Sequence, residues 1–195
     1  NNFKLQKFIF RPDLFDNIIK NNYNDKPDIA CFSISIWNEQ LSLKIASYLK
    51  EKYNCLIVFG GPSCPHNPVE YFEKNKFIDI AIRSEGEDAF NEIFMNYLLV
   101  KNNFSEIPNV AYRDISTKKC IINTNKIKFN RDLDAYPSPY LTGEFDYIVD
   151  KCDGNNFHAI VETNRGCPFL CTYCYWGRGG SNTKYRFHSL ERVFA

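Results

Sequence analysis

Strand-like and helix-like stretches alternate through the first half of this 195-residue chain. Residues 28–37 and 55–59 are apolar runs typical of strands buried on both faces, whereas residues 39–53 carry apolar side chains at helical spacing. The alternation predicts a parallel sheet with helices on both faces, because helices are the usual crossover between parallel strands. The expected strands are 4–10, 28–37, 55–59 and 77–82, and the expected helices are 13–22, 39–53, 68–74 and 88–100.

Small and polar residues follow three of the predicted strands. In an open sheet of this kind, ligands bind outside the carboxyl ends of the strands, so these residues are candidate ligand contacts. The pair Gly60-Gly61 has an alternative interpretation as an ordinary tight turn, since glycines commonly end strands. The candidates are Ser33, Ser35, Trp37, Gly60, Gly61, Glu85, Gly86 and Glu87.

The pattern changes after residue 102. Residues 109–114 and 119–123 alternate like the two strands of a hairpin. Residues 132–140 contain two prolines, which favour extended backbone and remove helix donors, so this stretch is expected to be a linker between domains. A strand is expected at 157–163 and a helix capped by Ser189 after it, which together resemble one β/α unit of a barrel.

Three cysteines, Cys167, Cys171 and Cys174, follow this last strand in a C-x3-C-x2-C spacing. Thiolates on one short loop suit an iron–sulfur cluster or zinc. Zinc ribbons usually take two C-x2-C pairs, whereas this chain has one such pair and its next upstream cysteine, Cys152, has no close partner. Three protein ligands leave one metal position open, which favours a site where a small molecule binds and reacts.

The segment from Arg165 to Cys174, Arg-Gly-Cys-Pro-Phe-Leu-Cys-Thr-Tyr-Cys, resembles the cluster loop of the radical S-adenosylmethionine enzymes. Gly166, Pro168 and the aromatic Tyr173 extend the match beyond the cysteine spacing. The resemblance implies that the three cysteines hold a 4Fe-4S cluster whose fourth iron binds S-adenosylmethionine. It also implies that Tyr173 borders the adenine, and that electron transfer yields a 5'-deoxyadenosyl radical.

Upstream of this loop, residues 32–38, 60–62 and 83–87 resemble the cobalamin-binding domain of the cobalamin-dependent members of that family. The resemblance implies a flavodoxin-like doubly wound parallel sheet of the cobalamin-binding type. Its first strand and helix are missing here, because residues 4–10 correspond to the family's second strand. The start of a TIM-like radical S-adenosylmethionine barrel follows. The expected domains are 1–104 for the cobalamin-binding type, 105–150 for the hairpin and linker, and 151–195 for the first barrel unit.

The implied function is hydrogen abstraction from an unactivated carbon and methyl transfer to it from cobalamin, by an enzyme of which this chain is an inactive fragment. The expected partners are a small-molecule or peptide substrate and a reducing protein such as flavodoxin or ferredoxin. One alternative is a radical oxidoreductase or cyclase with a cofactor-free structural first domain. Another, from a different class, is a non-catalytic module in which the three cysteines and Cys152 bind zinc.

Composition excludes several other classes. Lys and Arg number 24 against 23 Asp and Glu, and this net charge of +1 argues against a general nucleic-acid binder. The eight cysteines are unevenly scattered, and a cluster requires reduced thiolates, so a cytoplasmic location is expected. No apolar run approaches the roughly 20 residues that span a bilayer, so no membrane contact is expected.

Overall fold

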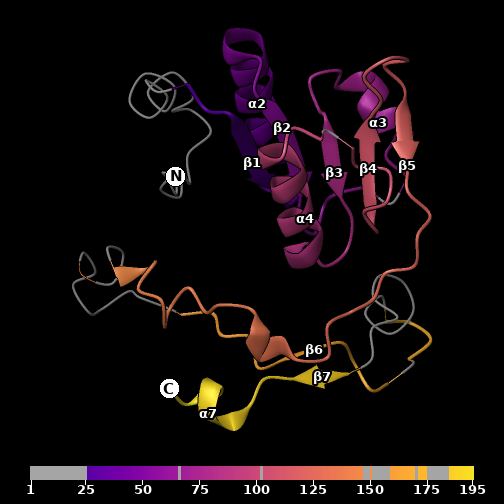
Figure 1. Cartoon of the computed structure of the whole chain (residues 1–195). Helices are drawn as coiled ribbons and strands as arrows, with labels where there is room; N and C mark the ends of the chain where they lie inside the picture. The colour runs from indigo at the N-terminus through magenta and orange to yellow at the C-terminus, as the bar shows by residue number, and fades with distance from the viewer. Residues whose placement is uncertain are drawn as a thin grey trace. The chain divides into compact units, whose positions relative to one another are not determined.

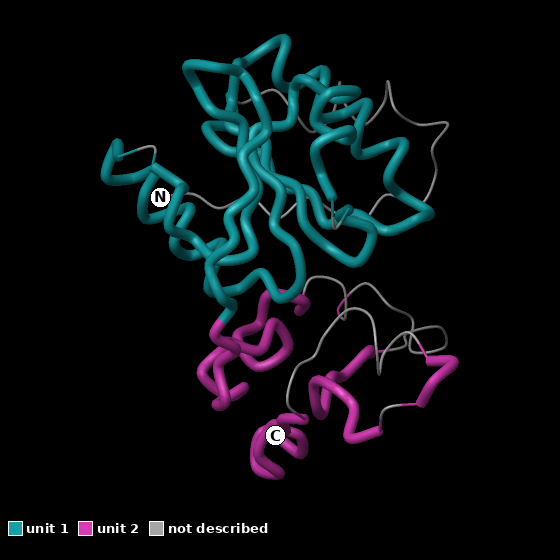
Figure 2. Tube along the Cα trace, turned by 90° about the vertical axis from the view of Figure 1, so that its right-hand side faces the viewer, with its two compact units in different colours: residues 1–127 teal, residues 128–195 magenta. Residues whose placement is uncertain are grey.

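The computed structural model describes residues 26–65, 67–101, 103–146, 150, 159–169, 171–174 and 185–195. The strand expected at 4–10 and the helix expected at 13–22 lie outside these ranges. The chain forms two compact units, residues 1–127 and 128–195, which Figure 2 shows in teal and magenta. A five-stranded sheet forms the core of the first unit, and a two-stranded ribbon lies in the second.

Three parallel strands begin the sheet of the first unit. They are β1 (Ile29–Ser33), β2 (Leu56–Gly60) and β3 (Ile80–Ile82), which lie next to one another in that order. The helices α2 (Glu39–Tyr53) and α3 (Val69–Lys74) connect them, and α4 (Glu87–Leu98) follows β3. The predicted α/β sheet is therefore confirmed, and α2 has the bounds that its periodicity predicts.

The helices cover both faces of this sheet. Neighbouring strand residues point to opposite sides, so apolar side chains on both faces need helices to bury them. Ile57 and Phe59 belong to a buried cluster with residues of α2 and α3, whereas Val58 belongs to a second cluster with α4. Ile45 and Leu49 of α2 are buried in the first cluster, at the four-residue spacing of one helix face. The core thus has the two layers that doubly wound sheets require.

The predicted hairpin forms the other edge of the same sheet. Its strands, β4 (Val110–Arg113) and β5 (Cys120–Ile122), pair antiparallel with each other, and β4 pairs antiparallel with β3. Figure 1 shows β3, β4 and β5 side by side. The Arg113 guanidinium donates to the carbonyls of Ile78 and Phe72 at 3.0 and 2.8 Å, which ties the hairpin to the region of α3. The sheet is therefore mixed, and the division of the complete protein at residues 104 and 150 stays a prediction.

The second unit contains short elements. A 3₁₀ helix, η2 (Leu133–Ala135), precedes the ribbon of β6 (Asn164–Arg165) and β7 (Arg186–Phe187), and α7 (Leu190–Val193) follows it. The strand expected at 157–163 was wrong in position: described residues 159–163 form no strand, because regular pairing begins only where β7 lies opposite. The predicted cap of the last helix is confirmed, since Ser189 Oγ accepts from the Arg192 amide at 3.1 Å. Within the described ranges, no helix combines the length and apolar character of a membrane span.

Candidate functional site

The loops after β1 and β2 are bonded to each other at the carboxyl edge of the sheet. The Ile34 amide donates to the Gly60 carbonyl at 2.8 Å, and the Ser63 amide donates to the Ile34 carbonyl at 3.1 Å. Gly61 has a φ of +95°, and a Cβ there would lie 2.7 Å from both the amide nitrogen and the carbonyl oxygen of Ile34. Only glycine fits this crossing of two backbones. The close approach of the Ile34 backbone therefore explains Gly61 as part of a tight turn, and this explanation does not require a ligand at the edge.

The loop after β1 presents two large apolar side chains to solvent. The Ser35 amide donates to Asn38 Oδ1 at 2.7 Å, and Asn38 Nδ2 donates to the Ser33 carbonyl at 3.0 Å. These bonds close a turn whose tip is Ile36 and Trp37, exposed at 82% and 81%. Both side chains lie at the edge where the sequence predicts ligand contacts.

The third predicted group follows β3 at the same edge. Gly86 immediately precedes α4 and accepts from the Phe90 amide at 2.7 Å, while Asn109 Nδ2 donates to the Glu85 carbonyl at 2.7 Å. Glu87 lies in the first turn of α4, where the helix dipole favours a carboxylate. Because β1, β2 and β3 are parallel neighbours, all the predicted contacts lie along one edge of the sheet. Their binding of cobalamin stays a prediction.

The cysteine loop lies in the second unit. Its thiols are free and half-buried, and the Cys174 amide donates to the Cys171 carbonyl at 3.2 Å, which makes a turn across the C-x2-C pair. Tyr173, at the tip of that turn, is 90% exposed, and Gly166 before Cys167 has a φ of +84°. In the described part of the chain, no three His, Cys, Asp or Glu side chains are grouped closely enough to hold a metal ion. The donor set nevertheless fits a cluster, since three free thiols lie on one short loop.

A ribbon and an ion pair form the base of this loop. Residues Asn164 and Arg165 pair with Phe187 and Arg186 across β6 and β7. Arg165 Nε donates to Glu162 Oε2 at 2.9 Å, so both charges are partnered before the first cysteine. The loop therefore starts and ends at the same two-stranded ribbon.

A second group of contacts was not anticipated from the sequence. The Asp134 carboxylate accepts from the Ser189 amide at 3.1 Å and contacts His188 Nδ1 at 2.8 Å. These hydrogen bonds from Ser189 and His188 lower the pKa of Asp134 to about 2. The Arg192 guanidinium donates to the carbonyls of Asp134 and Tyr136 at 3.2 and 2.5 Å. The sequence indicated only the Ser189 cap of this group. No local pattern predicts that Asp134 meets His188, because the two residues are 54 positions apart.

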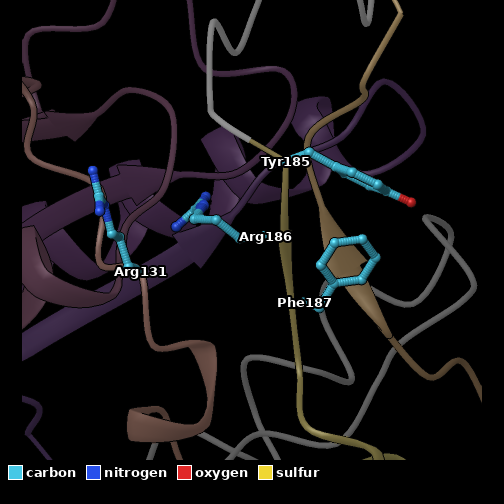
Figure 3. A pocket seen from close by; sticks show the side chains of 4 residues that line it. All are labelled: Arg131, Tyr185, Arg186 and Phe187. Carbon is cyan, nitrogen blue, oxygen red and sulfur yellow. The ribbon is translucent and has the colours of Figure 1, made fainter.

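A cavity of about 430 Å³ lies beside β7 and is lined by Arg131, Tyr185, Arg186 and Phe187. Figure 3 shows the Arg186 side chain extending toward Arg131, with Tyr185 and Phe187 on the other side of the strand. The two rings make an edge-on contact with centroids 4.3 Å apart. Arg186 itself is buried, and its Nη1 donates to the Asn130 carbonyl at 2.6 Å.

The cysteines of the first unit are not arranged as a second ligand set. Cys55 and Cys64 are buried, and burial raises the pKa of the Cys64 thiol to about 12. In the metal-free protein such a thiol stays protonated at neutral pH. Cys55 and Cys64 both pack in the first buried cluster as small apolar residues.

The fold and site define an α/β protein whose first unit is built on a mostly parallel sheet and whose second unit carries a three-thiol loop. No protein-family model matches the chain. It is 36% identical over 171 residues to the cobalamin-dependent radical SAM methyltransferase TokK of Streptomyces tokunonensis. This match covers 86% of this chain and 24% of that protein. It is 33% identical over 170 residues to the 2-(S-pantetheinyl)-carbapenam-3-carboxylate methyltransferase of Streptantibioticus cattleyicolor, with 86% and 24% covered.

A solved structure agrees in fold. The cobalamin-dependent S-adenosylmethionine radical enzyme OxsB, with aqua-cobalamin and S-adenosylmethionine bound, matches with a TM-score of 0.67 at 22% identity. The match covers 92% of this chain and 24% of that one. The chain belongs to the family of radical S-adenosylmethionine enzymes that have a cobalamin-binding domain, and it spans about a quarter of the length of these relatives.

Proposed function

We propose that the chain is part of a cobalamin-dependent radical S-adenosylmethionine methyltransferase that methylates an unactivated carbon. The observation that supports this most is the presence, in one chain, of a three-thiol loop and a doubly wound sheet whose predicted ligand contacts share one edge. The relatives named as methyltransferases support the choice of reaction over an oxidoreductase or cyclase.

In this proposal Cys167, Cys171 and Cys174 hold a 4Fe-4S cluster. Three thiolates leave one iron for the amine and carboxylate of S-adenosylmethionine, and the exposed ring of Tyr173 is available to its adenine. When bound, the cluster supplies the electron that cleaves S-adenosylmethionine, and cobalamin carries the methyl group. The reducing partner is a protein such as flavodoxin or ferredoxin, and the location is cytoplasmic.

Cobalamin would bind at the carboxyl edge of β1, β2 and β3. Gly60 suits a close approach, because a Cβ there would have no neighbour nearer than 3.9 Å. Trp37 offers an exposed ring to an apolar ligand face. The remaining contacts are Ser33, Ser35, Gly61, Glu85, Gly86 and Glu87.

The first test is anaerobic reconstitution of the full-length protein with iron and sulfide, followed by electron paramagnetic resonance of the reduced sample. We expect a 4Fe-4S signal that changes on addition of S-adenosylmethionine, and a corrin absorption spectrum after incubation with cobalamin. Uptake of zinc without iron would contradict the enzyme proposal. A responsive cluster without corrin binding would instead indicate the oxidoreductase or cyclase alternative.

The cluster ligands are tested by Cys171→Ala in the full-length protein. We expect cleavage of S-adenosylmethionine to fall by at least about 10³-fold, because two thiolates cannot hold the site-differentiated cluster. The matched control is Cys120→Ala, a half-buried cysteine of β5 in the first unit. Release of 5'-deoxyadenosine is measured by chromatography, and wild-type rates in Cys171→Ala would exclude this residue as a ligand.

A further inference from the structure

The stretch that contains η2 contacts the segments before and after the cysteine loop. We call residues 128–136 the strap; all of its contacts described here lie within the second unit.

The strap holds the segment that follows the loop. The Asp134 carboxylate contacts His188 Nδ1 at 2.8 Å and accepts from the Ser189 amide, and the His188 side chain is 8% exposed. Arg186 Nη1 donates to the Asn130 carbonyl at 2.6 Å, and its guanidinium lies 5.3 Å from the Phe129 ring centroid. Arg186 and His188 are two residues apart in extended chain, so their side chains point to the same side, and this side faces the strap.

The strap also contacts the segment that precedes the loop. The Arg165 guanidinium lies 5.5 Å from the centroid of the Tyr136 ring, within the range of a cation–π interaction. Arg165 is two residues before Cys167, the first of the three cysteines. The carbonyl of the same Tyr136 accepts from Nη2 of Arg192, in α7 after the ribbon, at 2.5 Å.

The ribbon alone is a weak base for this loop. β6 and β7 have two residues each, and the further backbone bond from the His188 amide to the Thr163 carbonyl measures 3.0 Å. Isolated two-stranded ribbons are marginally stable, so additional contacts are needed to hold the loop ends in one orientation. Among the described contacts, Tyr136 is the strap residue that touches both β6, which precedes the loop, and α7, which follows the ribbon.

We infer that Tyr136 is a positioning residue: its ring holds Arg165 before the cysteine loop, its carbonyl holds Arg192 of α7 after the ribbon, and these two contacts set how the cluster faces S-adenosylmethionine. The inference rests on the proposed function for its link to the cluster. A small misplacement of reacting groups lowers rates strongly, so loss of the ring contact is expected to act on cleavage more than on cluster binding. Substitution of the side chain leaves the carbonyl bond to Arg192 in place, which separates the two contacts.

The test compares Tyr136→Leu with Tyr136→Phe in the full-length reconstituted protein. Leucine removes the aromatic face under Arg165, whereas phenylalanine keeps it. For Tyr136→Leu we expect wild-type iron content, a reduced-cluster resonance whose response to S-adenosylmethionine is broadened or lost, and cleavage lowered about tenfold. Tyr136→Phe is expected to restore the wild-type spectrum. Identical spectra and cleavage in wild type and Tyr136→Leu would overturn the inference.

A second readout does not depend on the cluster. Hydrogen exchange of the apoprotein should rise in residues 163–174 of Tyr136→Leu and stay unchanged in residues 56–82. If wild type assembles no cluster, the proposed function fails, and exchange alone then decides whether the strap anchors the loop. If Tyr136→Leu fails to fold, Arg165→Met removes the same contact together with the ion pair to Glu162, so Glu162→Gln, which weakens only the ion pair, is measured beside it. Unchanged exchange in the loop would overturn the anchoring role.

Discussion

At the scale of single residues, the two adjacent glycines after β2 have different constraints. A Cβ at Gly61 would collide with the Ile34 backbone, and its φ of +95° is unfavourable for other residues, whereas a Cβ at Gly60 would meet Ile82 at 3.9 Å. Gly61→Ala should therefore lower the free energy of unfolding by about 1–3 kcal/mol, while Gly60→Ala should change it little. Urea unfolding of the two variants measures this difference. Equal losses would show that the backbone crossing is not the constraint.

Asp134 makes the stability of the second unit depend on pH. Its pKa is lowered to about 2 by hydrogen bonds from Ser189 and His188, against roughly 3.9 in an unfolded chain. A lowered folded pKa means that its contribution is complete above about pH 4 and is lost as the pH falls toward 2. We expect the Asp134→Asn variant to lose less free energy of unfolding than wild type as the pH falls from 4 to 2. Unfolding followed at several acidic pH values, with Asp150→Asn as control, measures the slope, and parallel curves would contradict the assignment.

At the scale of elements, one carboxylate connects helix α2 with strands β2 and β3. Asp79 Oδ2 accepts from the Ile57 amide at 2.8 Å and from Lys50 Nζ at 2.7 Å, and both side chains are partly buried. Asp79→Ala should therefore lower the free energy of unfolding by about 1–3 kcal/mol, since a partly buried amide and ammonium lose their acceptor. Glu51→Ala, on the exposed face of α2, is the control. Denaturant titration measures both, and equal midpoints would contradict this role.

The ends of elements could be predicted where the signal is local. The bounds of α2 and the cap at Ser189 follow from helical spacing and from a hydroxyl before an apolar turn. The strand at 157–163 was misplaced because a strand needs a partner, and β7 lies opposite only residues 164–165. Likewise, the alternation of the hairpin predicted two strands but not that β4 pairs with β3.

At the scale of the whole molecule, the proposed cofactor site predicts a function for an exposed side chain. Trp37 is 81% exposed on a turn held by Asn38. Trp37→Ala in the full-length protein should therefore leave stability within about 0.5 kcal/mol of wild type but weaken cobalamin retention about tenfold. Corrin absorbance after desalting measures retention, and Ile115→Ala is an exposed apolar control. Equal corrin content in both variants would exclude Trp37 from the site.

The sequence by itself determined the alternation of strands and helices, the three-thiol loop and the family, because these depend on spacing within short segments. Only the tertiary structure decided that Gly61 is required by the Ile34 backbone and that the hairpin extends the sheet. It also decided that Asp134 meets His188 and that the Tyr136 ring meets Arg165. These contacts join residues that are far apart in the chain, and side-chain chemistry alone does not specify which distant partner a carboxylate, a ring or a strand edge will meet.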